Sequence, residues 1–284
     1  MQTIQWFPGH MAKAKREISE KIKQVDLIIE LKDARIPYAS TNPMISEIIG
    51  NKPRLILLCK SSLADPAVTK AWMDYYASQK IISLDIDSIT GYHTKDILKY
   101  ATLALKEVFD KRKTKGITSK TIKAMILGIP NVGKSTLINT LAKRKATTVG
   151  DRPGVTKNQT WIKINEDLYL LDTPGILWPK FEDQEVGLKL AMCGSIKDEI
   201  LDLNGLVLRS LDYISKYYPE QLKNRYKIEI TDSLSMQEQI GRTRGFLSKG
   251  GIVDLERTNR MFINELRGMK IGAMSYERPE DQSI

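Results

Sequence analysis

One eight-residue segment constrains the fold of this chain more than any other. Residues 128–135, GIPNVGKS, match the pattern G-x-x-x-x-G-K-[ST]. They follow an apolar run at 122–127 that is typical of a buried strand, and they precede a helical pattern at 134–142. Glycines in such a turn let backbone N–H groups point at a phosphate, and the helix N-terminus adds partial positive charge. The segment therefore predicts a phosphate-binding loop inside a parallel α/β sheet.

The residues of this loop have different expected contacts with a nucleotide. Lys134 would reach the β- and γ-phosphates, and the Ser135 hydroxyl would bind Mg²⁺. A glycine turn without a ligand is the alternative, but strand, turn and helix occur here in the order that phosphate binding needs. The expected phosphate contacts are Asn131, Val132, Gly133, Lys134, Ser135 and Thr136.

Two later segments offer groups for a metal ion and for a γ-phosphate. Residues 172–175, DTPG, end an apolar run and have the form D-x-x-G. Asp172 would hold Mg²⁺ through water, and the Gly175 N–H would contact the γ-phosphate. Thr156 lies between the two motifs in a loop where a hydroxyl can bind Mg²⁺ once a γ-phosphate is present; a surface threonine is the alternative.

Short apolar runs alternate with helical patterns over the first two-thirds of the chain, which is typical of a doubly wound α/β sheet. The expected strands are 27–31, 55–58, 81–86, 122–127 and a hairpin pair at 161–164 and 168–171. The expected helices are 11–24, 67–77, 96–109 and 134–142, and the polar stretch 110–121 is the expected linker. Beyond residue 179 the apolar residues recur at helical spacing. We therefore predict an α/β domain over 1–180 and a smaller all-helical domain over 185–284.

Positive charge is concentrated in two parts of the chain. The whole sequence carries 44 Lys and Arg against 34 Asp and Glu, a net charge of +10. Residues 106–163 contain 14 basic and three acidic residues, and residues 1–24 contain five and two. Concentrated positive charge attracts phosphate backbones. This distribution favours a polyanionic partner, and a merely solubilising surface charge is the alternative.

Composition also excludes several classes of protein. Two cysteines are too few for a disulfide scaffold or a cysteine-rich metal site. No apolar run approaches the roughly 18 residues of a membrane span, and residues 1–10 lack the pattern of a secretory signal. We expect a cytoplasmic protein without a membrane partner.

The phosphate loop, the Thr156 loop and the D-x-x-G segment look like the phosphate half of a Ras-like GTPase. In that family a base-reading N-K-x-D segment follows D-x-x-G, but nothing of this kind lies downstream of Gly175. Instead, both candidate base-binding segments lie upstream, each at the end of an apolar run. This order resembles that of the circularly permuted GTPases. The candidate base-binding residues are Cys59, Lys60, Ser61, Ser62, Asp87 and Ser88.

Three further segments narrow the resemblance to the ribosome biogenesis GTPase A family within the permuted TRAFAC-class GTPases. They are PGHMAK at 8–13, DARIP at 33–37 and DTPGILWP at 172–179. The resemblance implies a Ras-like P-loop sheet that binds GTP and GDP, uses Mg²⁺ and hydrolyses GTP during assembly of the large ribosomal subunit. It also implies a low intrinsic rate that ribosomal particles raise, contact with rRNA, including through the helical domain, and a monomer.

The same resemblance assigns a water-orienting residue and a second cation. Ras-type enzymes orient the attacking water with a glutamine after D-x-x-G, but Ile176 and Leu177 follow Gly175 here. The family pattern gives this role to His10, for which a surface-loop histidine is the alternative. Asn131 stands where related enzymes bind K⁺.

The chain departs from the family at the base reader. Cys59 and Ser62 stand where N-K-x-D has Asn and Asp, and only Lys60 is kept. The Asp carboxylate of the pattern accepts two hydrogen bonds from guanine, each worth roughly 1.5–3 kcal/mol. A serine hydroxyl cannot accept both, which predicts weakened guanine selectivity, with Asp65 as a second candidate reader. Two alternatives therefore stay open: a general P-loop ATPase, and an RNA-binding assembly scaffold whose nucleotide site is weakened or base-unselective.

Overall fold

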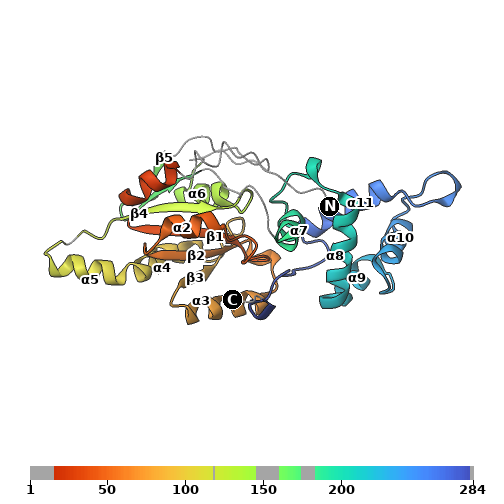
Figure 1. Cartoon of the computed structure of the whole chain (residues 1–284), viewed down its shortest axis with the longest axis horizontal. Coiled ribbons are helices and arrows are strands. Elements are labelled where there is room, and N and C mark those ends of the chain that lie inside the picture. The colour runs from red at the N-terminus through yellow and green to blue at the C-terminus, as the bar shows by residue number, and fades with distance from the viewer. Residues whose placement is uncertain (1–15, 118, 145–159, 174–182, 282–284) are drawn as a thin grey trace.

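The computed structural model describes residues 16–117, 119–144, 160–173 and 183–281. A six-stranded sheet with helices on its faces occupies one side of the molecule, and a cluster of helices occupies the other (Figure 1). The strands are β1 (Leu27–Asp33), β2 (Arg54–Cys59), β3 (Ile82–Asp85), β4 (Ile122–Gly128), β5 (Thr160–Lys163) and β6 (Leu168–Asp172).

The order of strands across the sheet is β3-β2-β1-β4-β6-β5. Five strands are parallel, and β5 alone runs antiparallel, against β6. The predicted α/β sheet is confirmed, including the hairpin pair.

The direction of winding reverses between β1 and β4, which are neighbours in the sheet. From β1 the chain continues outward through β2 and β3, whereas β6 and β5 lie on the far side of β4. In open α/β sheets, ligands bind beyond the carboxyl ends of the strands at such a reversal. The strands approach closely there: a Cβ on Gly128 would lie 3.1 Å from the Leu31 carbonyl oxygen. The phosphate loop therefore leaves the sheet at the position where this topology binds ligands.

Eight helical elements lie between residues 22 and 142 of the described chain. They are η1 (Ile22–Gln24), α2 (Pro43–Ile49), η2 (Ser61–Leu63), α3 (Pro66–Ser78), η3 (Thr94–Asp96), α4 (Ile97–Ala104), α5 (Lys106–Thr114) and α6 (Lys134–Ala142). Residues 16–21 are also helical, so the described part of the expected helix 11–24 is confirmed.

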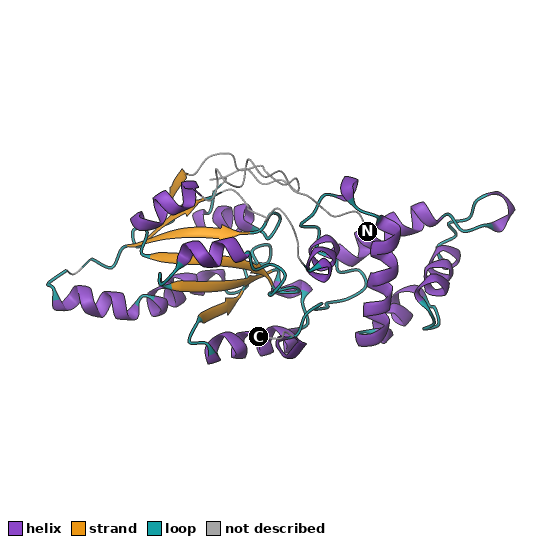
Figure 2. Ribbon diagram, viewed as in Figure 1, coloured by secondary structure: helices purple, strands orange, loops and turns teal. Residues whose placement is uncertain are grey.

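Helices cover both faces of the sheet (Figure 2). On one face, the helical residues 16–21 together with α2 and α3 pack on inward-facing residues such as Ile28 and Ile56. On the other face, α4 and α6 pack on residues such as Leu27, Ile29 and Leu31 of β1. Because successive side chains of a strand point to opposite faces, one apolar run supplies both layers of the core.

Three of these helices differ from the sequence-based expectation. The single helix expected at 96–109 is divided into α4 and α5, because the backbone of Leu105 leaves the helical conformation, with φ -99° and ψ 9°. The seven residues of α2 were not predicted, because so short an apolar segment has no clear helical period. Helix α5 runs to Thr114, so the linker expected at 110–121 was wrong in its first part. Lysine and arginine are good helix formers, and Arg112 forms an ion pair with Asp26, just before β1. The basic residues therefore extend the helix instead of ending it.

The described residues from 183 onward are helical, apart from one isolated bridge between Leu247 and Val253 and the loops between elements. The elements are α7 (Gln184–Met192), η4 (Asp198–Ile200), α8 (Leu203–Tyr217), α9 (Pro219–Tyr226), α10 (Ser233–Thr243), η5 (Lys249–Gly251), α11 (Leu255–Arg267) and η6 (Pro279–Asp281). Aspartates cap α7, α8, α10 and α11, each accepting a hydrogen bond from a backbone N–H of the first turn. The domain boundaries 1–180 and 185–284 stay a prediction.

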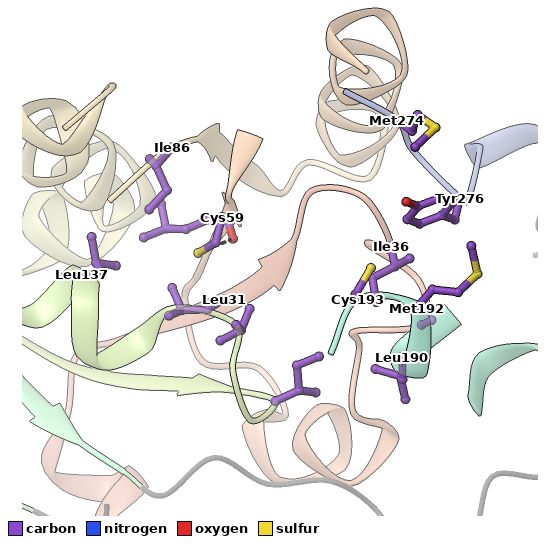
Figure 3. Packing of buried hydrophobic residues seen from close by; sticks show 14 of the residues in the cluster. Leu31, Ile36, Cys59, Ile86, Leu137, Leu190, Met192, Cys193, Met274 and Tyr276 are labelled. Atoms are coloured by element: carbon purple, nitrogen blue, oxygen red, sulfur yellow. Dashed lines mark hydrogen bonds between the residues drawn. The ribbon is translucent and has the colours of Figure 1, made fainter. Parts of the chain in front are cut away.

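The segment 274–277 returns from the helices to the sheet. The Tyr276 N–H donates to the Arg35 carbonyl at 2.8 Å, and the Trp72 indole donates to the Glu277 carbonyl at 3.2 Å. Figure 3 shows Tyr276 close to Ile36 and to Cys193 at the end of α7. The sheet and the helices thus share one continuous hydrophobic core.

Candidate nucleotide site

The phosphate loop has the backbone conformation that its glycines and asparagine permit. Asn131 and Gly133 have φ angles of 59° and 106°, and α6 begins directly afterwards at Lys134. Val132 is 1% exposed and anchors the loop in the core. Ser135 and Thr136 occupy the first turn of α6 and are half-buried. The loop therefore leads into a helix N-terminus, as the sequence predicted.

Lys134 and Asp172, which the sequence places 38 residues apart, meet in the structure. The Lys134 ammonium donates to Asp172 Oδ1, and both side chains are buried. Burial lowers the pKa of Lys134, and the Asp172 carboxylate opposes that shift. The first turn of α6 and the end of β6 thus place a cation and a carboxylate side by side beyond the sheet.

The loop after β2 holds the candidate base reader. Lys60 has a left-handed backbone, with φ 58°, and its ammonium lies 3.1 Å from Asp33 Oδ2. Cys59 is 1% exposed, and its thiol donates to the Leu57 carbonyl at 3.7 Å. Burial raises the pKa of this thiol, so it is neutral at physiological pH. A base-binding role for Cys59 stays a prediction.

The other candidate base-binding residues come together beyond the carboxyl ends of β2 and β3. The Ser62 hydroxyl donates to Asp87 Oδ2. The Ser61 N–H donates to the Ile86 carbonyl at 3.1 Å, which joins the two loops through the backbone as well. The Ser88 carbonyl accepts a hydrogen bond from the Thr140 hydroxyl of α6 at 3.0 Å. Sequence reasoning missed Thr140, because no local pattern indicates a contact between positions 52 residues apart.

Asp65, the second candidate reader, has other partners. Its Oδ1 accepts the backbone N–H groups of Ala67 and Val68, at 2.9 and 3.4 Å, and so caps α3. Its Oδ2 accepts from the Tyr218 hydroxyl at 3.3 Å. The structure therefore uses this carboxylate to begin a helix and to contact the carboxyl end of α8.

Asp33 and Arg35 connect the site to the helices. The Arg35 guanidinium donates to both carboxylate oxygens of Asp33, at 2.9 and 2.8 Å, and also to the Cys193 carbonyl at 3.4 Å. Burial alone would raise the pKa of Asp33, but Arg35 and Lys60 outweigh it and hold that pKa well below its usual value. The phosphate loop contacts the same segment after α7, because the Asn131 amide donates to the Gly194 carbonyl at 2.9 Å.

Three predicted site residues lie outside the described residues: His10, Thr156 and Gly175. Their roles stay predictions. The described groups nevertheless place the phosphate loop, the carboxylate of D-x-x-G and the two candidate base-binding loops beyond the carboxyl ends of the strands.

A phosphate loop at the reversal of this sheet, preceded in the chain by the strands that carry the candidate base-binding loops, is the arrangement of a circularly permuted P-loop GTPase. A family model described as "50S ribosome-binding GTPase" matches residues 123–239. Ribosome biogenesis GTPase A of Bacillus cereus is 51% identical over 98% of this chain and 95% of its own, and that of Priestia megaterium is 52% identical over 98% of each. The chain belongs to the ribosome biogenesis GTPase A family.

Solved structures agree with this assignment. A GDP-bound structure of TM YlqF covers 94% of this chain and 100% of its own, with 28% identity and a TM-score of 0.69. GNP-bound YlqF from T. maritima covers 94% and 99%, with 29% identity and a TM-score of 0.66. Membership in this family favours a GTPase over a general P-loop ATPase or a scaffold without a working site.

Proposed function

We propose that this GTPase couples GTP hydrolysis to assembly of the large ribosomal subunit. The observation that carries the proposal is the Lys134–Asp172 pair at the sheet reversal, which would supply the cation and the metal-side carboxylate of phosphoryl transfer. The names of the relatives and the description of the matching family model support the ribosomal partner. GTP and GDP are the proposed ligands.

The proposed phosphate contacts are the backbone of residues 131–136 and the Lys134 ammonium. Mg²⁺ would be held by Ser135, Thr156 and Asp172, a set of hydroxyl and carboxylate oxygens that suits this hard cation. Bound there, Mg²⁺ neutralises developing charge on the phosphates.

The remaining proposed contacts extend this site. Gly175 would contact the γ-phosphate, and His10 would orient the attacking water. K⁺ at Asn131 rests on the family resemblance.

The charge distribution supports rRNA as the surface that this GTPase contacts. Helix α5 contains no buried residue, and Lys111 and Lys113 in its last turn are exposed. Exposed lysines can neutralise phosphates and release their counterions. We propose α5, with the other basic residues of 106–163, as one part of the rRNA contact.

We also propose a cytoplasmic monomer. Both cysteines, Cys59 and Cys193, are free and buried thiols, which suits a reducing compartment. Within the described ranges, none of the helices combines the length and the apolar character that a bilayer span requires.

Binding to isolated large ribosomal subunits should weaken steeply with salt. Between about 50 and about 200 mM salt we expect a loss of more than about tenfold, because phosphate contacts release counterions. A variant with Lys111→Glu and Lys113→Glu should bind more weakly and show a shallower salt dependence. Cosedimentation over a salt series measures both quantities.

A matched control carries Lys70→Glu and Lys80→Glu, two exposed lysines in and just after α3. It makes the same change in net charge away from α5 and should behave as the wild type does. Binding that stays flat across the salt series would refute the rRNA contact.

A further inference from the structure

The candidate base-binding loops contain a carboxylate, that of Asp87, that is not part of the N-K-x-D pattern. Ser62 stands at the position of the pattern's aspartate, and it is exposed. The Ser62 hydroxyl, in the loop after β2, donates to Asp87 Oδ2, in the loop after β3. The charge missing from position 62 is therefore present one hydrogen bond away.

The loop after β3 fixes the position of Asp87. The Asp87 Oδ1 accepts the backbone N–H groups of Ile89 and Thr90, at 2.8 and 3.0 Å. Its backbone N–H donates to the Tyr92 carbonyl at 3.1 Å, and its carbonyl accepts from the Gly91 N–H at 2.9 Å. These bonds occupy Oδ1 and leave Oδ2 directed to Ser62.

Asp87 is also ionised. Burial by itself raises the pKa of Asp87, but hydrogen bonds from Ser62, Thr90 and Ile89 outweigh it, so the net pKa lies below the ordinary value. An ionised carboxylate only accepts hydrogen bonds. With its hydrogen given to Asp87, the Ser62 oxygen is an acceptor toward any further group. The two adjacent oxygens, Asp87 Oδ2 and Ser62 Oγ, thus form a pair of acceptors.

We propose that Ser62 and Asp87 together read the guanine base, as one acceptor pair in place of the single aspartate of N-K-x-D. Guanine presents two adjacent donors, N1–H and the 2-amino group, on one edge, whereas adenine presents an acceptor at N1. An acceptor pair therefore binds guanine and repels adenine. This inference rests on the proposed nucleotide site, and it predicts that guanine selectivity is kept despite Ser62.

Exchanging Asp87 for asparagine tests the pair. Asp87→Asn keeps an oxygen for the Ile89 and Thr90 N–H groups but replaces an acceptor by an N–H₂ donor. Affinity for GDP should fall about tenfold or more. Affinity for xanthosine diphosphate, which has a carbonyl where guanine has the 2-amino group, should rise relative to GDP. Competition against a fluorescent GDP on the full-length protein measures both.

Two further variants distinguish base reading from a folding effect. Adding Ser62→Asp to Asp87→Asn returns a carboxylate to the pair and should restore the preference for GDP. Ser62→Ala should lower the GDP-to-ADP preference several-fold, and this result reports on the pair even if Asp87→Asn fails to fold. Asp85→Asn is the matched control: this carboxylate contacts His93, and its loss should leave the preference unchanged.

The results separate this inference from the proposed site. Wild-type protein that binds no guanine nucleotide would overturn both. Wild-type protein that binds GDP, with a preference over xanthosine diphosphate and ADP that neither Asp87→Asn nor Ser62→Ala changes by more than about twofold, would overturn the acceptor pair alone.

Discussion

Replacing Lys134 by alanine is expected to weaken GTP and GDP binding by at least about tenfold, about 1.4 kcal/mol. In the proposed site, the ammonium is the cation that contacts the β- and γ-phosphates. Its removal also leaves the Asp172 carboxylate buried without this partner, so negative charge at the site increases. Titration calorimetry with GDP measures the loss directly.

The matched control is Lys143→Ala, which removes an exposed lysine from the carboxyl end of the same helix. It changes the net charge equally and should leave the affinity unchanged. Unaltered affinity in Lys134→Ala would remove the basis for assigning residues 128–135 to phosphate binding.

Arg35→Ala should destabilise the protein by about 3–5 kcal/mol, the usual cost of breaking a buried ion pair from one side. The Asp33 side chain is fully buried, and the Arg35 side chain is 4% exposed. Without the guanidinium, the Lys60 ammonium is the cation that still pairs with Asp33, and the Cys193 carbonyl loses a donor. Chemical denaturation of the nucleotide-free protein gives the change in unfolding free energy.

Lys60→Ala is the comparison, because Lys60 pairs with the same carboxylate but is 24% exposed. Solvent screens this contact, so its loss should cost less. Combining Asp33→Ala with Arg35→Ala should cost less than the sum of the two single changes, since neither charge of the pair remains without the other. A cost below about 1 kcal/mol for Arg35→Ala would show that this ion pair contributes no more than a surface contact does.

Local patterns predicted the parts of the fold that depend on neighbouring residues. The parallel strands are rich in apolar residues because both faces of the sheet are buried, and the phosphate loop is a contiguous motif. Helix α2 escaped prediction because seven residues show no clear period, and the end of α5 because a basic stretch is equally compatible with a linker and with a helix.

Contacts between distant segments could not be predicted in the same way. The hydrogen bond from Ser62 to Asp87 depends on the register of β2 against β3, which no local pattern specifies. The contact of Asn131 with Gly194 spans 63 residues and requires the helices to be placed on the sheet. Asp65 has the right residue type for a base reader, but its Oδ2 accepts from the Tyr218 hydroxyl, 153 residues along the chain.

The most direct test of the account is the rate of GTP hydrolysis by purified protein with and without large ribosomal subunits. The proposed site binds phosphate and metal, and the partner completes it, so we predict slow hydrolysis alone and hydrolysis at least about tenfold faster with the subunits, a difference of about 1.4 kcal/mol in the barrier. Lys134→Ala should lose GTP hydrolysis both alone and with the subunits. Hydrolysis that large subunits do not accelerate, at a salt concentration where they bind, would contradict the proposed coupling.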